Sequence, residues 1–244
     1  MDTMLLTGAN RGLGLEWVRQ LDQAGWRILA CCRNPAKAAE LNAIAAKSKG
    51  RVTVHELDVT HHSQVERLAH ELRDVPIDVL NNNAGVLPTR DKWGETDYHK
   101  WQELIWTNLF STCKVSEAFT PHVAKSRRRI ILTMASTLSS VSMPGGGPLV
   151  WGDDKHVYRT TKAAINMLAK SMSGYLKPMG IIVVSINPGW ANTEMGRQDL
   201  EADQTTEILL DPVVSIRSMR QLIDKLTLNE TGNLYKWNGE ELPP

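Results

Sequence analysis

The chain has 244 residues and a net charge of +1, with 28 Lys and Arg against 27 Asp and Glu. This balance gives no global reason to expect a nucleic acid or an anionic membrane as a partner, and no run of about 20 apolar residues predicts a membrane span. The N-terminus shows no signal-peptide pattern. The cysteines Cys31, Cys32 and Cys113 do not form a disulfide framework, and neither HExxH nor paired CxxC occurs. We expect one domain over residues 1–244, a cytoplasmic location and no metal site.

Short apolar runs alternate with helical stretches along the whole chain. The runs predict strands near 3–7, 27–32, 51–56, 77–81, 129–134, 181–186 and 232–237. Between and after them, periodic stretches predict helices near 13–24, 35–47, 62–73, 97–125, 157–176 and 211–226. Strands such as IIVVSI are apolar on both faces, as expected when helices cover both sides of a sheet. The alternation predicts an α/β fold: a doubly wound (Rossmann) parallel sheet of about seven strands with helices on both faces.

Three further segments stand out between these elements. Two long irregular stretches, near 141–157 and 190–210, are predicted to be loops that bind the substrate, because loops of this size in a compact domain are often functional. The basic run 127–129 directly precedes an apolar strand. We expect it to be a solvated cap ahead of that strand.

The first strand ends in the glycine-rich turn TGANRGLG. Gly8, Gly12 and Gly14 lie between an apolar strand and a helix. Without side chains, the chain can turn sharply and the helix N-terminus can approach a pyrophosphate. The spacing GxxxGxG differs from the usual GxGxxG, and no Gly-Lys-Ser/Thr follows, so this is not a P-loop. In the first strand–helix unit of a doubly wound chain, the turn predicts nucleotide binding.

Other strand ends carry polar or turn-forming residues as well. Each is ordinary turn chemistry by itself. Ligands of this fold bind outside the carboxyl ends of the strands, so the repetition indicates a site there. Asp58, which is placed to hydrogen-bond an adenine edge, follows the third strand; Asn82, Asn83, Ala84 and Gly85 end the fourth, Ser136 the fifth, and Pro188 and Gly189 the sixth.

The stretch YRTTK places Tyr158 and Lys162 four residues apart on a predicted helix. Residues at this spacing share one face. Two interpretations are open at this point. The pair is either a half-exposed tyrosine beside a solvated lysine, or a lysine that tunes a tyrosine as a proton donor. Spacing alone favours the first.

The order and spacing of TGANRGLG, NNAG, Ser136, YRTTK and NPG resemble the short-chain dehydrogenase/reductase family from about residue 3 to the C-terminus. The segments CRNPAKAAEL, PGWANTEM and YKWNGEELPP are most similar to the C-factor and Sniffer-type carbonyl reductases. Three departures occur. Asn81 replaces an apolar residue at a buried strand end and bears on local packing, Thr161 replaces the serine of YxxSK, and LTMAS stands where VNISS is common. None removes a catalytic residue of the family.

The resemblance implies hydride transfer between a nicotinamide and a carbonyl or alcohol carbon, with Ser136, Tyr158, Lys162 and Asn108 as catalytic residues. Tyr158 would exchange a proton with the substrate oxygen. A free tyrosine titrates near pH ~10, and a nearby ammonium favours the phenolate. Lys162 would supply that ammonium and hold the nicotinamide ribose hydroxyls. Ser136 would hydrogen-bond the substrate oxygen, and Asn108 would hold a water that links Lys162 to solvent.

The same resemblance implies an NADP(H) site. Its predicted residues are Gly8, Asn10, Arg11, Gly12, Leu13, Gly14, Arg33, Asp58, Val59, Asn83, Ala84, Gly85, Tyr158, Lys162, Pro188, Gly189, Trp190 and Thr193. The second strand ends in Arg33 without the carboxylate typical of NAD sites. Arg33 and Arg11 therefore suit a 2′-phosphate and predict a preference for NADPH over NADH. The alternative is that Arg33 is a solvated loop residue and Arg11 a surface residue.

The predicted substrate-binding residues are Ser136, Trp151, Tyr158 and Trp190. The two tryptophans either line an apolar pocket or anchor the long loops. The leading prediction is an NADPH-dependent carbonyl reductase acting on a small-molecule aldehyde or ketone. Two alternatives stay open, an alcohol dehydrogenase for a polar substrate and an NAD(P)-binding signalling protein of the C-factor type. The helices near 97–125 and 157–176 form dimer faces in many relatives, which leaves a homodimer or a homotetramer open.

Overall fold

The computed structural model of the chain describes residues 1–87, 93–141, 155–198, 200 and 205–243. Its strands are β1 (Thr3–Thr7), β2 (Arg27–Cys32), β3 (Val52–Glu56), β4 (Val79–Asn82), β5 (Ile130–Met134), β6 (Ile182–Asn187), β7 (Leu234–Lys236) and β8 (Glu241–Leu242). They form one sheet in the order β3-β2-β1-β4-β5-β6-β7-β8, in which only the β7–β8 pair is antiparallel. The chain reverses its direction of winding between β1 and β4, which is where ligands of this fold bind.

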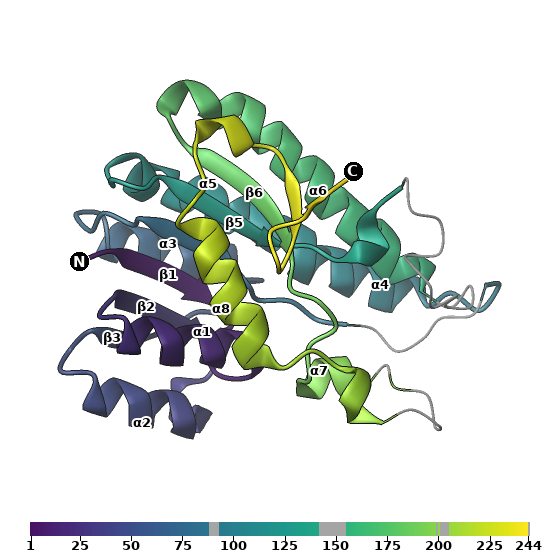
Figure 1. Ribbon diagram of the computed structural model, residues 1–244, viewed down its shortest axis with the longest axis horizontal. Coiled ribbons are helices and arrows are strands. Elements are labelled where there is room, and N and C mark those ends of the chain that lie inside the picture. Colours follow the sequence, from purple (N-terminus) through teal and green to yellow (C-terminus); the bar gives the residue numbers. More distant parts are fainter. Residues whose placement is uncertain (88–92, 142–154, 199, 201–204, 244) are drawn as a thin grey trace.

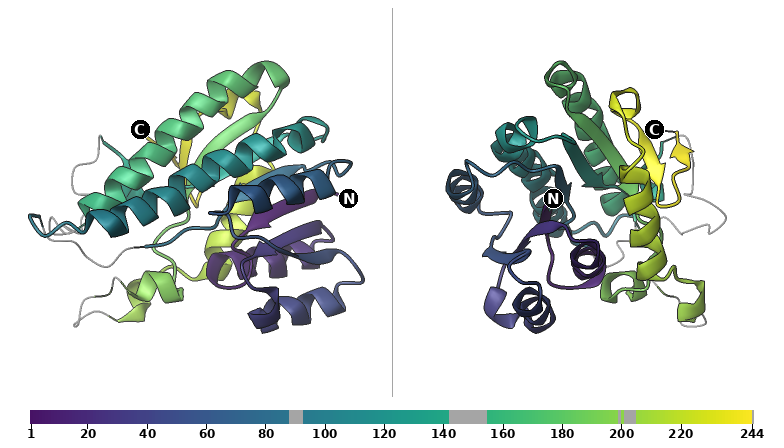
Figure 2. Two further views of the ribbon diagram at one scale, coloured as in Figure 1. Left: turned by 180° about the vertical axis from the view of Figure 1, so that it is seen from behind. Right: turned by 60° about the vertical axis from the view of Figure 1, so that its left-hand side comes forward.

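Helices cover both faces of the sheet. They are α1 (Gly12–Gln23), α2 (Ala39–Lys47), α3 (His62–Glu71), α4 (Tyr98–Ile105), α5 (Ser111–Ala124), α6 (His156–Leu176), α7 (Glu194–Arg197) and α8 (Pro212–Ile223). Figure 1 shows α1, α2 and α8 in front of the sheet, and Figure 2 shows α3, α5 and α6 on the opposite side. In the part of the chain with described structure, no helix is both long and apolar enough to cross a lipid bilayer.

The core has two halves because successive side chains of a strand point to opposite faces. Met4 and Leu6 of β1 pack with Trp17 of α1 in one half. Leu5 packs with Phe119 of α5 in the other. All five side chains are fully buried, and each such burial stabilises the fold by about 1.5–3 kcal/mol. The predicted doubly wound α/β sheet with helices on both faces is thereby confirmed.

Among the described residues the sheet has eight strands, against the predicted count of about seven, and the additional strand is β8. β8 returns antiparallel to β7 after a tight turn in which Gly239 adopts a φ of 87°. The Lys236 N–H donates to the Glu240 carbonyl at 2.8 Å and closes this hairpin. The dipeptide Asn238-Gly239 is a strong hairpin signal, because glycine adopts positive φ without steric cost, and it was the sequence feature that could have revealed β8.

The segment predicted as one helix over 97–125 contains a π-helical turn, η2 (Trp106–Phe110), between α4 and α5. The segment predicted as a loop over 190–210 contains α7 and a 3₁₀ turn, η6 (Thr206–Ile208). Of the other predicted loop, residues 142–154 lie outside the described part of the chain. Further 3₁₀ turns are η1 (Pro35–Lys37), η3 (Thr137–Ser139), η5 (Lys177–Met179) and η7 (Leu228–Glu230).

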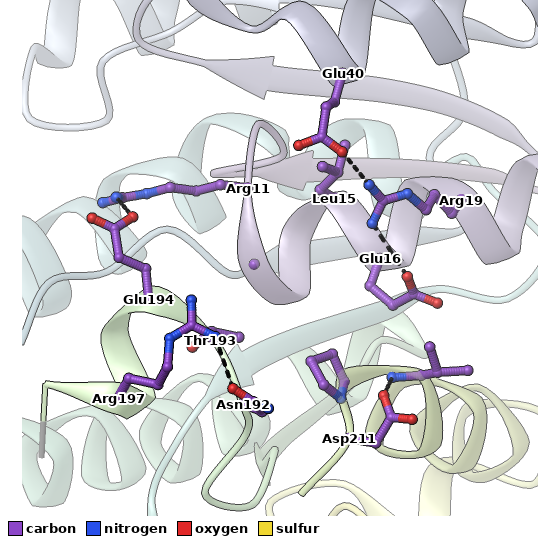
Figure 3. A pocket seen from close by; sticks show the side chains of 13 residues that line it. Arg11, Leu15, Glu16, Arg19, Glu40, Asn192, Thr193, Glu194, Arg197 and Asp211 are labelled. Atoms are coloured by element: carbon purple, nitrogen blue, oxygen red, sulfur yellow. Dashed lines mark hydrogen bonds and ion pairs between the residues drawn. The ribbon is translucent and has the colours of Figure 1, made fainter. Parts of the chain in front are cut away.

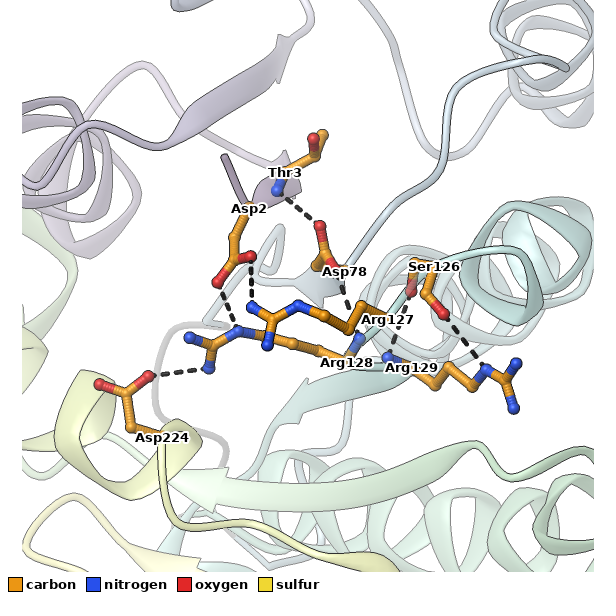
Figure 4. A network of polar contacts seen from close by, with 8 residues as sticks. All are labelled: Asp2, Thr3, Asp78, Ser126, Arg127, Arg128, Arg129 and Asp224. Atoms are coloured by element: carbon orange, nitrogen blue, oxygen red, sulfur yellow. Dashed lines mark hydrogen bonds and ion pairs between the residues drawn. The ribbon is translucent and has the colours of Figure 1, made fainter.

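Arg128 departs from the solvated cap predicted for the run 127–129. Its side chain is 22% exposed, and it bonds the Asp2 carboxylate through Nε at 2.6 Å and the Asp224 carboxylate through Nη1 at 2.8 Å. Its guanidinium also lies 5.0 Å from the centroid of the Trp26 ring. Arg127 fits the prediction better, being 75% exposed. Figure 4 shows this network at the amino end of the sheet, where Arg128 joins the N-terminus to α8.

Asn81 is fully buried within β4. Its Nδ2 has only the Met4 sulfur at 4.0 Å, and among the described residues its Oδ1 accepts no hydrogen bond. An unpaired buried carbonyl oxygen costs about 1–3 kcal/mol. Asn81, which replaces an apolar residue of the family, still pairs in register with β1. The replacement costs stability because it leaves a buried polar group unsatisfied.

Candidate active site

The glycine turn joins β1 to α1 at the carboxyl end of the sheet. Gly8 and Gly12 have φ of 67° and 54°, which glycine adopts readily. A Cβ on Gly14 would lie 2.1 Å from the Gly8 carbonyl oxygen, so only glycine lets α1 start this close to the strand. Leu13 packs on the core and Asn10 is exposed. The open turn below a helix N-terminus fits a pyrophosphate.

Thr7 links this turn to the one that follows β4. Its Oγ accepts hydrogen bonds from the backbone N–H groups of Asn83 at 3.0 Å and Ala84 at 2.9 Å. The Asn83 amide in turn donates to the Thr7 carbonyl at 2.9 Å. A Cβ on Gly8 would lie 3.0 Å from the Ala84 Cα, so the two backbones touch. The structure thus brings the predicted residues of both turns together at the switch point, and sequence reasoning missed Thr7, which holds them.

Asp58 follows β3 and caps the turn that leads into α3. Its Oδ1 accepts hydrogen bonds from the Thr60 N–H at 3.0 Å and the Thr60 hydroxyl at 2.7 Å. Burial opposes ionisation of this carboxyl, but the Thr60 hydrogen bonds and the charges of His61 and Arg33 outweigh it, and the pKa of Asp58 is lowered. The carboxylate is therefore charged at neutral pH. The next residue, Val59, is buried.

The two predicted phosphate-binding arginines have different surroundings. Arg11 forms an ion pair with Glu194 of α7, and both side chains are more than half exposed. Arg33 is exposed and close enough to Asp58 to help lower its pKa. Arg11 and Glu194 line a hollow of 380 Å³ between α1, α2, α7 and the start of α8 (Figure 3). This hollow borders the glycine turn at Gly12 and does not include Tyr158.

Tyr158 and Lys162 lie on the first turns of α6, as predicted. Lys162 is buried, donates from Nζ to the Met134 carbonyl at 2.7 Å, and lies 5.7 Å from the centroid of the Tyr158 ring. Burial lowers the pKa of Lys162 to about 8. This geometry rules out the solvated lysine of the first interpretation. It places an ammonium beside the tyrosine at neutral pH.

Ser136 lies just beyond β5 and caps η3. Its Oγ accepts a hydrogen bond from the Leu138 N–H at 3.2 Å. Its carbonyl accepts from the Ser139 N–H at 3.1 Å and also from the Ser139 hydroxyl. Asn166 of α6 donates to that hydroxyl oxygen at 2.7 Å. Sequence reasoning missed Ser139 and Asn166, although Asn166 stands four residues after Lys162 and so on the same helix face.

Asn108 is buried on the π-helical turn η2. Its Oδ1 accepts from the Val86 N–H at 2.9 Å, and its Nδ2 donates to the Val86 carbonyl at 3.0 Å. A Cβ on Gly85 would lie 3.2 Å from this Oδ1. The side chain therefore holds the segment after β4. The Asn108 backbone carbonyl accepts from the Thr112 hydroxyl at 2.7 Å.

The chain after β6 packs α7 against the glycine turn. Gly189 has a φ of 79°, and the Pro188 carbonyl accepts from Ser215 of α8 at 2.7 Å. The Trp190 indole donates to the Gly196 carbonyl at 2.8 Å. Thr193 caps α7, and its methyl group would lie 3.5 Å from a Cβ on Gly12. Trp190 thus anchors its loop, whereas the predicted substrate residue Trp151 lies outside the described residues.

The sheet is doubly wound and has a glycine turn at its switch point. Ser136 lies beyond β5, and Tyr158 and the buried Lys162 lie at the start of α6. This arrangement is typical of an oxidoreductase of the dinucleotide-binding class. Comparison with known families agrees. The profile of the short chain dehydrogenase family matches residues 2–204, and this chain belongs to that family.

Individual relatives place the chain among the C-signal and Sniffer types. C-signal of Myxococcus xanthus is 31% identical, over 69% of this chain and 93% of its own length. The carbonyl reductase Sniffer of D. melanogaster superposes with a TM-score of 0.88 at 28% identity, over all of both chains. The NADPH-bound carbonyl reductase from chicken fatty liver gives a TM-score of 0.89 at 26% identity, over 100% of this chain and 99% of the other.

Proposed function

We propose that this protein reduces the carbonyl group of a small-molecule aldehyde or ketone to an alcohol, with NADPH as the reductant. The observation that carries the proposal is the buried Lys162 ammonium beside Tyr158, next to the strand end that bears Ser136. The carbonyl reductases from chicken fatty liver and D. melanogaster support the same reaction class through their similarity over the whole chain. We further propose one NAD(P)-binding domain over residues 1–244 and a cytoplasmic location.

The chain offers residues for each part of NADP(H). The glycine turn of Gly8, Gly12 and Gly14 takes the pyrophosphate. Arg33 and Arg11 take the 2′-phosphate, and Asp58 takes the adenine edge. The remaining predicted cofactor residues lie at the glycine turn (Asn10, Leu13), after β3 (Val59), around the turns after β4 and β6, and on α6 (Tyr158, Lys162). Bound NADPH supplies the hydride for the carbonyl carbon.

Three side chains handle the developing charge and the proton. Tyr158 donates its phenolic proton to the carbonyl oxygen, a general-acid step worth about 10²–10⁴-fold in rate. The Lys162 ammonium favours the phenolate that remains. Ser136 donates a hydrogen bond to the same substrate oxygen as negative charge develops on it. Each of these groups acts at one end of the sheet, beyond β5 and at the start of α6.

A panel of substrates tests this function directly. NADPH oxidation, followed by absorbance, is measured against aldehydes, ketones and quinones, and NADP⁺ reduction is measured against sugar and sterol alcohols. We expect turnover with aldehydes or ketones. Turnover confined to polar alcohols would favour the dehydrogenase alternative instead.

The similarity to C-signal favours a second candidate function, a signalling protein that binds NAD(P). Under this alternative the purified protein binds NADPH, as measured by quenching of tryptophan fluorescence, but oxidises it with no carbonyl of the panel. The set of Ser136, Tyr158, Lys162 and Asn108 argues against a purely non-catalytic role.

A further inference from the structure

A chain of hydrogen bonds runs from the helix that bears Tyr158 and Lys162 to the backbone of Ser136. Asn166 of α6 donates from Nδ2 to the Ser139 hydroxyl oxygen at 2.7 Å. The Ser139 hydroxyl donates in turn to the Ser136 carbonyl, which also accepts from the Ser139 N–H at 3.1 Å. Ser139 is buried. The link therefore fixes the 3₁₀ turn η3 against α6.

The direction of these hydrogen bonds is settled by chemistry. The Ser136 carbonyl can only accept, so the Ser139 hydroxyl must give it a proton. Ser139 Oγ then offers a lone pair to Asn166, whose amide must present its NH₂ group. The Asn166 Oδ1 is consequently turned away, and within the described residues this buried atom accepts no hydrogen bond.

A buried, unpaired carbonyl oxygen lowers stability, so the fold gains little from an asparagine at this position. A leucine, which has the same branching and number of side-chain heavy atoms in a larger volume, would remove that cost. What the amide does supply is a fixed contact to the turn of Ser136. Unsatisfied groups of this kind call for an explanation, and the contact to the turn of Ser136 supplies one.

Two side chains on one face of α6 form hydrogen bonds with residues on either side of Ser136 in the chain. Lys162 Nζ bonds the carbonyl of Met134, two residues before it. Asn166 bonds the side chain of Ser139, three residues after it. We propose that Asn166 is a positioning residue, which sets the Ser136 hydroxyl relative to Tyr158 through Ser139. This inference rests on the proposed role of Ser136 in carbonyl reduction.

The variant Asn166→Leu separates positioning from stability. We expect kcat for carbonyl reduction to fall about five- to twenty-fold, since small displacements of a catalytic group cost rate. The melting temperature should stay the same or rise, because the unpaired Oδ1 is removed. The Kd for NADPH, measured by fluorescence, should be unchanged. A merely structural role predicts a lower melting temperature instead.

A double-mutant cycle identifies the residue through which Asn166 acts. In the Ser136→Ala background, Asn166→Leu should lower kcat less than twofold further, because the hydroxyl that it positions is gone. Ser139→Ala should reproduce the loss seen with Asn166→Leu. Ser173→Ala is the matched control, since it removes another buried α6 hydroxyl, which bonds the Lys170 carbonyl at 2.7 Å. It should leave kcat unchanged.

The outcomes distinguish the two levels of inference. If Ser136→Ala keeps the wild-type kcat, the proposed function of Ser136 is wrong. If Ser136→Ala lowers kcat while Asn166→Leu does not, or if the two losses multiply in the double variant, Asn166 is not a positioning residue for Ser136.

Discussion

Lys162 combines burial with a positive charge. Burial alone moves the pKa of this lysine from the ordinary value of 10.5 to about 8, and its ammonium has a backbone carbonyl as partner where a carboxylate would hold the charge more firmly. A neutral carbonyl leaves the ammonium's field available to the neighbouring tyrosine. The residue is therefore charged at neutral pH and loses its charge within the accessible alkaline range.

The pH profile of carbonyl reduction should report this ionisation. Below about pH 8 Lys162 is protonated and supports the Tyr158 phenolate, and above it the support is lost. We expect kcat/KM at saturating NADPH to be level near neutrality and to decline above about pH 8. A rate that stays level to about pH 10 would show that the lysine charge does not assist the proton transfer.

Replacement of Tyr158 by Phe tests the proton donor. We expect turnover to fall at least about 10²-fold, because the general acid is lost, while the Kd for NADPH changes little, since the hydroxyl is one of many cofactor contacts. Lys162→Ala should impair both turnover and binding. A Tyr158→Phe variant that kept more than about a tenth of the wild-type activity would mean that Tyr158 is not the acid.

Arg33 tests the choice of cofactor. We expect the wild-type enzyme to prefer NADPH strongly. Arg33→Asp should reverse or greatly weaken that preference, because a guanidinium binds phosphate whereas a carboxylate repels it. The maximal rate at saturating cofactor should change little. Lys37→Asp makes the same charge change four residues further on, and should leave the ratio of kcat/KM for NADPH and NADH unchanged. Equal use of the two cofactors by the wild type would contradict this assignment.

At the scale of single elements, α7 is too short to be stable alone. It is held by its capping residue Thr193, by the Trp190 indole, and by the Arg11–Glu194 ion pair with the glycine turn. The ion pair is exposed and contributes about 0–1 kcal/mol. The Thr193 cap and the indole hydrogen bond therefore fix this part of the predicted substrate loop.

Trp190 gives the prediction for this element. If its ring also lines an apolar pocket, benzaldehyde-like substrates should have a higher kcat/KM than glyceraldehyde-like ones. Trp190→Phe loses the N–H donor, worth about 1 kcal/mol, and part of the ring, but it keeps an apolar aromatic surface and should keep the preference. Trp190→Ala loses the ring and should abolish it. Equal efficiency of the wild type with both substrates would leave Trp190 as a loop anchor alone.

Across the whole molecule, the predicted catalytic residues and a stabilising network of ion pairs lie at opposite ends of the sheet. The predicted catalytic residues lie beyond the carboxyl ends of the strands. The network of Asp2, Asp78, Arg128 and Asp224 lies at the amino ends, where Asp78 accepts from the Thr3 N–H at 2.9 Å and from the Arg128 N–H at 3.2 Å. Changes to this network should affect unfolding without touching the site.

Asp2→Asn tests the network. Burial raises the pKa of Asp2, but hydrogen bonds from Arg127 and Arg128 outweigh it and the net pKa is lowered. A lowered carboxyl pKa stabilises the fold above the unfolded-state value, and this contribution is lost as the pH falls through the folded-state value. We expect the variant to lower the free energy of unfolding in urea by about 1–2 kcal/mol near pH 7, and by much less near pH 3.

Asp224→Asn is the control, because this side chain is 60% exposed and its ion pair should contribute less than about 1 kcal/mol. Equal losses for Asp2→Asn at both pH values would mean that the Asp2 charge does not stabilise the fold. The kcat of both variants should match the wild type.

The sequence by itself determined the fold class and most of the predicted site. Alternating apolar runs and helical stretches are local patterns, and they predict a doubly wound parallel sheet with right-handed crossovers, whereas the order of its strands came from the structure. The spacing of Tyr158 and Lys162 and the glycines of the first turn are local as well, so their placement followed from the sequence. The dipeptide Asn238-Gly239 could also have predicted the hairpin that forms β8.

Only the tertiary structure decided which distant residues meet. Arg11 forms an ion pair with Glu194, which is distant in the sequence. Arg128 likewise pairs with Asp2 and Asp224, and Asn166 bonds Ser139. Such contacts depend on how helices and strands pack, and no local periodicity encodes them. The same holds for the pKa of Lys162, because burial in a low-dielectric environment arises only when α6 closes over the end of β5.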